Sequence, residues 1–194
     1  MPLLTEKPPK GFEKVLDASV AELVGHGALA LAGRARPAVS APIRVFHMGA
    51  DAVAAGKGLA AAQPTGWLAT LVTNGEVRGT IELVPPKPPR KGAEPPAVVR
   101  FGGFTTGPLQ RGLAAALDAA TKAAGRNEVE VSVLRAPALY LLALWLRDKN
   151  GDRLVPIAPC PPPLKAGETY TAERALSMLA EAAKAVLEGD DTRN

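Results

Sequence analysis

The sequence predicts an α+β fold, in which a mainly antiparallel sheet built from hairpins is covered by about three helices. Two Asn-Gly pairs, at 74–75 and 150–151, each separate two strand-like runs, and this pair favours the tight turn of a β-hairpin. Three amphipathic runs have helical spacing. They do not alternate singly with strands, as a doubly wound parallel sheet would require.

The first half of the chain contains a helix, a short strand and the clearest hairpin. Apolar residues three and four positions apart predict a helix over 12–31, and Ile43–Phe46 predicts a strand. The Ala-rich segment 50–63 predicts a second helical stretch that is interrupted at Gly56 and Gly58. In the hairpin at 67–84, the Asn-Gly turn predicts one apolar, buried face and one solvent-exposed (wet) face. The expected apolar pairs are Val72 with Val77, Thr70 with Gly79 and Leu68 with Ile81, and the expected wet residues are Glu76, Arg78, Thr80 and Glu82.

Four further elements are expected between residues 98 and 146. Val98–Phe101 predicts a strand, and Leu109–Ala124 predicts a helix that ends at Gly125. Strict alternation of apolar and polar residues over Glu128–Leu134 predicts a half-exposed strand towards a sheet edge. The apolar run Ala138–Leu146 predicts a strand covered on both faces, although its composition also suits a buried helix.

The chain ends with a second hairpin and a helix. Asp148–Asp152 is expected to form the turn, and Leu154–Ile157 the returning strand. A helix is expected from Thr171 until Gly189 stops it. Its expected buried stripe consists of Ala175, Leu176, Leu179, Ala182, Ala183, Val186 and Leu187.

We therefore expect a polar lead-in at 1–10, a single α+β domain at 11–189 and a polar tail at 190–194. Within the domain, the Pro- and Lys/Arg-rich segment 85–96 excludes a central strand or helix and predicts an exposed connector. The two hairpins share an Asn-Gly-acidic string followed by Arg, which either reflects a faint internal duplication or follows from turn chemistry alone.

Composition favours a cytoplasmic protein. A single cysteine excludes an intrachain disulfide and fits a reducing compartment, the start lacks the apolar core of a secretory signal, and no apolar run is long enough for a membrane span. Abundant Ala, Gly and Pro with few aromatic residues suit a GC-rich bacterial genome. The net charge of +4 comes from residues 1–100 and is too modest for more than weak nucleic-acid contact.

Catalytic candidates are sparse, so an enzyme is not the favoured interpretation. His47 could act as a general base oriented by Asp51, although a strand-end histidine bonded to backbone explains it as well. The Gly102–Gly107 turn, placed between a strand and a helix, could bind an anion. Cys160 lies among prolines, where nothing lowers a thiol pKa. Two histidines and one cysteine do not supply a metal site, and no cofactor is expected.

The leading functional hypothesis is a non-enzymatic protein-binding or assembly module, either an adaptor or a subunit of a larger complex that can also self-associate. Lys87, Arg90 and Lys91 in the Pro-rich connector are its candidate partner-binding residues. The alternative is a small enzyme acting on an anionic or acyl substrate near His47 and the Gly102–Gly107 turn.

Overall fold

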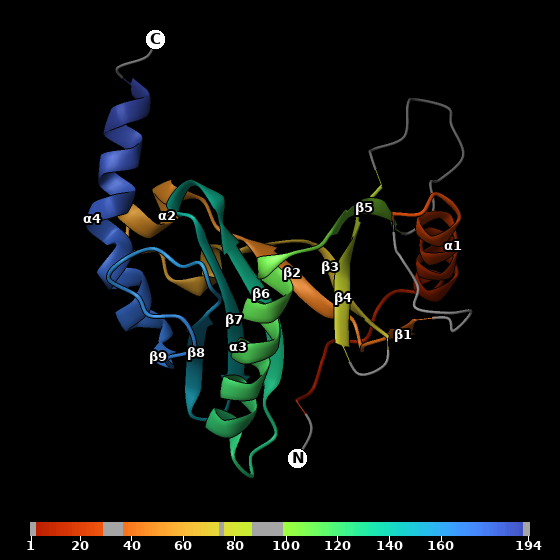
Figure 1. Ribbon diagram of the computed structural model, residues 1–194. Coiled ribbons are helices and arrows are strands. Elements are labelled where there is room, and N and C mark those ends of the chain that lie inside the picture. The colour runs from red at the N-terminus through yellow and green to blue at the C-terminus, as the bar shows by residue number, and fades with distance from the viewer. Residues whose placement is uncertain (1–2, 29–36, 74–75, 87–98, 192–194) are drawn as a thin grey trace.

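The computed structural model describes residues 3–28, 37–73, 76–86 and 99–191 (Figure 1). In the first half the elements are α1 (Phe12–Gly25), β1 (Ala38–Val39), β2 (Ile43–His47), α2 (Ala50–Ala54), the 3₁₀ turn η1 (Leu59–Ala61), β3 (Gln63–Thr73), β4 (Glu76–Val84) and β5 (Arg100–Thr105). The second half contains α3 (Pro108–Ala124), β6 (Glu130–Ala136), the 3₁₀ turn η2 (Pro137–Leu139), β7 (Leu141–Asp148), β8 (Gly151–Pro156), β9 (Tyr170–Thr171) and α4 (Ala172–Asp191).

One nine-stranded sheet runs through both halves. Its order is β5-β4-β3-β2-β6-β7-β8-β9, with β1 paired to β3. Every pairing of these strands is antiparallel except that of β2 with β6 at the centre. The mainly antiparallel α+β prediction is therefore confirmed. The same series of elements occurs once on each side of the β2–β6 junction. Each series contains a helix, a strand, a short helical turn, a hairpin and an edge strand, in that order.

Helices α1 and α4 cover the same face of this sheet. The register sets Trp67, Arg44, Ser132 and Trp145 in one row across β3, β2, β6 and β7, so their side chains share a face. Phe12 of α1 packs edge-on against Trp67, with ring centroids 5.9 Å apart. At the other end of the row, α4 and α2 pack in one apolar cluster with Trp145.

Helix α3 covers the opposite face, where it packs on the central strands between the two outer helices (Figure 1). Leu113, Ala116 and Ala120 of α3 are buried against Val133 of β6 and Leu144 of β7. Strand β7 is therefore covered on both faces, as predicted for 138–146, and the choice between strand and helix is settled in favour of a strand that starts at residue 141.

The first hairpin forms, but its predicted register is wrong beyond one pair. Val72 does face Val77, and a bulge between Leu71 and Val72 then shifts the pairing, so that Thr70 faces Thr80 and Leu68 faces Glu82. The expected wet face is also mostly covered, and Thr80 is buried. Alternation along the strand could not reveal this, because α1 and α3 cover the two faces from distant parts of the chain.

Glycines explain one agreement and one correction. The helical stretch at 50–63 is interrupted where predicted, and it consists of α2 and η1, because Gly56 and Gly58 between them adopt φ of 64° and 66°. The predicted anion-binding turn at 102–107 is largely strand β5 instead. A Cβ on Gly102 would lie 2.7 Å from the Val84 side chain, so glycine permits the close pairing of β5 with β4.

Two helix ends and the position of one strand also differ from expectation. Helix α1 ends at Gly25, and the predicted residues 29–31 lie outside the described chain. Strand β6 is central instead of near an edge, because β2 pairs with it in parallel. Helix α4 continues through Gly189 to Asp191, into the predicted tail. No helix among the described residues is long and apolar enough to span a membrane.

We predict that truncating the central strand destabilises the fold far more than truncating the end of α4. Leu144 of β7 is fully buried between helices, so Leu144→Ala should lower the free energy of unfolding by about 3 kcal/mol. The matched control Leu187→Ala, on the exposed end of α4, should change it by about 0.5 kcal/mol. Urea unfolding followed by circular dichroism measures both values, and equal losses would contradict the packing described above.

Candidate functional site

His47 and Asp51 lie near the start of α2, but no hydrogen bond joins their side chains. His47 is the exposed last residue of β2, and its side chain has no hydrogen bond or ion pair among the described residues. Asp51 lies in the first turn of α2 and folds back towards Gly49. The base–orienter hydrogen bond that the enzymatic hypothesis needs is therefore not formed between this pair.

The second part of that hypothetical site lies elsewhere. Strands β4 and β3 separate β5, which contains Gly102 and Gly103, from the strand of His47. Since neighbouring strands lie about 4.8 Å apart, the axes of β5 and β2 are roughly 14 Å apart. Thr105 is paired along β4 and β3 with Thr70, whereas His47 is paired with Gln63, so the two segments are also displaced along the strands. The structure does not bring them together.

Of the other candidates, the structure describes Cys160 but not the basic residues of the connector. Burial raises the pKa of the Cys160 thiol, which donates a hydrogen bond to the Leu164 carbonyl. Lys87, Arg90 and Lys91 lie outside the described residues, as does most of the 85–96 connector. Asp148 accepts bonds from the Asn150 amide and from Arg153, as a hairpin turn requires. Among the described residues, no cluster of potential metal ligands occurs.

A hollow of about 630 Å³ lies between α2, the β7–β8 turn and the first half of α4. Apolar side chains of both helices contribute to its wall, and the turn at Asn150 and Gly151 closes one end. Its only charged lining groups are the carboxylates of Asp152 and Glu173. One oxygen of Asp152 accepts a 2.9 Å hydrogen bond from the Trp145 indole, which fixes that carboxylate at the rim.

Tyr140 forms an unusual tip next to α4. It follows η2 in a left-handed conformation, with φ of 52°, and it is the one described non-glycine residue with positive φ. Its side chain is 86% exposed. Because a side chain in this conformation is strained by about 1–2 kcal/mol, the chain holds an aromatic ring in solvent at a cost in stability.

The end of α4 exposes apolar side chains near this tip. Val186 and Leu187, predicted to be buried, are each 39% exposed. Both lie one turn beyond Ala183, which shares a buried cluster with Leu139 of η2. Figure 1 shows that the last turns of α4 extend past the rest of the fold. We call the groove, the Tyr140 tip and the exposed end of α4 the α4 surface.

Sequence reasoning missed this surface for physical reasons. The apolar stripe of α4 is continuous from Ala175 to Leu187, and nothing in it marks where the supporting sheet ends. The conformation of Tyr140 depends on how η2 packs against α4, which is a tertiary contact. Pro137 of η2 was the one local signal for this boundary. Because proline is disfavoured within a central strand, it indicated that the strand begins after residue 138.

Comparisons with protein-family models, with curated proteins and with solved structures found no significant match to this chain.

We predict that Cys160 reacts slowly as a nucleophile. A raised thiol pKa leaves little thiolate near neutral pH, and the thiolate is the reactive form. Alkylation by iodoacetamide at pH 7.5, followed by mass spectrometry, should be at least roughly threefold slower in the folded protein than in the same chain unfolded in urea. Faster alkylation of the folded protein would instead indicate an activated thiol.

Proposed function

We propose that this protein is a non-enzymatic protein-binding or assembly module, an adaptor or a subunit of a larger complex, whose partner docks on the α4 surface. The observation that carries the proposal is Tyr140, a strained and 86% exposed tyrosine that directly follows η2, the element packed against α4. Tyrosine is enriched among the residues that dominate binding energy at protein interfaces.

The exposed end of α4 supports the same conclusion. A helix end without tertiary packing gains little stability from its own turns, and most helical stability in proteins comes from burying an apolar face. Val186 and Leu187 extend that face beyond the sheet. A partner that covered them would complete the packing that the sheet provides for the earlier turns of the helix.

The charges on this surface favour a basic partner. Asp152 and Glu173 are the charged groups that line the groove, and Glu188 follows on an exposed position of α4. Glu181 and Lys184 form an ion pair at 2.7 Å that raises the pKa of Lys184, so these two side chains together add no net charge to the surface. The partner we propose is an amphipathic segment in which Lys or Arg flank the apolar side chains, since such charges complement the acidic rim.

We predict that a basic amphipathic peptide binds the α4 surface. A fluorescein-labelled helical peptide with a Leu stripe and Lys elsewhere should bind at least roughly tenfold more tightly than the same peptide with Glu in place of Lys. The double variant Tyr140→Ser, Leu187→Ser should weaken binding of the Lys peptide roughly tenfold or more, because interface tyrosines contribute on the order of 2 kcal/mol. Fluorescence anisotropy measures each affinity.

The matched control is Lys122→Ser, an exposed change on α3 at the opposite face of the sheet, which should leave peptide affinity unchanged. Equal binding of the Lys and Glu peptides would contradict the proposed partner chemistry. Concentration-dependent dimerisation that the double variant abolishes, measured by sedimentation equilibrium, would contradict it in favour of a second copy as the occupant.

A further inference from the structure

Arg44 is the one arginine of the central strands without a hydrogen bond to the rest of the described chain. Its neighbours all have acceptors: Arg135 bonds Glu82, Arg147 bonds Glu130 and Ser132, and Arg153 bonds Asp148. Arg44 instead stacks over the Trp67 ring, with its guanidinium carbon 4.7 Å from the ring centroid. Among the described residues, only the Glu6 carboxylate approaches the guanidinium, at 3.9 Å from Nε, which is too long for a hydrogen bond.

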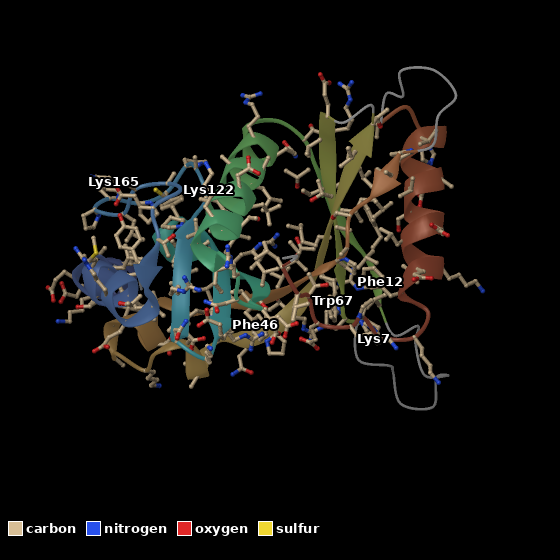
Figure 2. The ribbon with its side chains drawn as sticks, turned by 90° about the horizontal axis from the view of Figure 1, so that it is seen from below. Lys7, Phe12, Phe46, Trp67, Lys122 and Lys165 are labelled. Atoms are coloured by element: carbon tan, nitrogen blue, oxygen red, sulfur yellow. The ribbon has the colours of Figure 1, made fainter. Side chains whose placement is uncertain are left out.

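Arg44 lines a pocket of about 350 Å³ in the N-terminal half. Its side chain is 21% exposed, and none of its nitrogens is both buried and unbonded, so the guanidinium N–H groups remain accessible to a ligand in place of water. Pro9, Trp67, Pro85 and Val99 supply the apolar walls, and Lys7 and Glu6 the remaining charges. Figure 2 shows Lys7, Trp67 and Phe12 gathered in this half, apart from the α4 region.

We propose that this pocket binds an organic carboxylate, with Arg44 as the residue that recognises it. A guanidinium held flat on an aromatic ring keeps its outer N–H groups in a plane, which matches the two oxygens of a carboxylate. Lys7 adds a second positive charge at the pocket, so that Glu6, Lys7 and Arg44 together leave one positive charge for the ligand to neutralise. The apolar walls select a carboxylate attached to a hydrophobic body.

The carboxylate can come from a small organic acid or from the C-terminal residue of a peptide, since both present the same group. The probes are 3-phenylpropionate, its uncharged amide, and a hexapeptide that ends in phenylalanine with either a free or an amidated C-terminus. Titrations are followed by ¹⁵N NMR at the Arg44 Nε–H and Trp67 indole signals of the full chain. We expect the free acids to shift both signals, and their amides to bind at least roughly tenfold more weakly.

Three variants test the assignment. Arg44→Met keeps an apolar chain over Trp67 and should weaken carboxylate binding at least roughly tenfold. Lys7→Met should weaken it about threefold, and Glu6→Gln should strengthen it about threefold, because Glu6 is the competing carboxylate. Lys7 and Glu6 lie on the exposed N-terminal segment, so these two variants keep the test valid even if Arg44→Met fails to fold. Arg111→Met on α3 is the control and should change nothing.

A preference for 3-phenylpropionate over the free-acid peptide would identify a small-molecule site, and the reverse a peptide-terminus site. Equal binding of acids and amides, no binding of any probe, or unchanged affinity in all three variants would overturn the proposal. The pocket belongs to the N-terminal half and shares no residue with the α4 surface, so either proposal can fail without the other.

Discussion

The parallel pairing of β2 with β6 is the constraint on which the rest of the fold depends. It joins two antiparallel halves into one sheet, from Arg44 opposite Ser132 to His47 opposite Arg135, and the Met48 amide extends it with a 2.8 Å bond to the Arg135 carbonyl. An ion pair reinforces the junction, since Arg135 of β6 contacts both carboxylate oxygens of Glu82 in β4 at 2.7 Å. Because a parallel pair needs a long connection, all of α2, β3, β4, β5 and α3 lie between these two strands in the chain.

The junction also determines which surfaces remain uncovered. It places α1 and α4 on one face at opposite ends of the sheet, with α3 alone on the other face, so that the central strands are buried from both sides (Figure 1). The helix of the first half is supported along its apolar stripe by β3 and β4. Helix α4 is longer than the sheet beneath it, which leaves Val186 and Leu187 without the cover that their pattern predicts. Both proposed binding regions therefore follow from the same arrangement.

The sequence predicted those features that local chemistry determines. The turn residues at 150–151, the apolar run of β7 and the Gly125 stop of α3 each act within a few residues, and each was located correctly. What failed depended on distant segments: the bulge at Leu71 and Val72, the central position of β6 and the exposure of Leu187. His47 and Asp51 were selected as site candidates because histidine and aspartate are common catalytic residue types. Tyr140 and Arg44 were not selected, because their proposed roles depend on the residues around them in the fold. A left-handed conformation and a guanidinium stacked on a tryptophan without a protein acceptor are properties of tertiary packing, so single-sequence patterns do not reveal them.

Native-state hydrogen exchange tests most directly the claim that one sheet unites the halves and leaves Val186 and Leu187 of α4 exposed. We predict that the amides of Phe46 and Leu134 in the junction exchange only through global unfolding, with the same denaturant dependence. The amides of residues 185–190 should exchange through local fraying at much lower free energy. Exchange of the junction through a separate, smaller opening would show that the halves are independent units. Protection of the α4 end equal to that of the core, in dilute protein, would show that its apolar face is already covered.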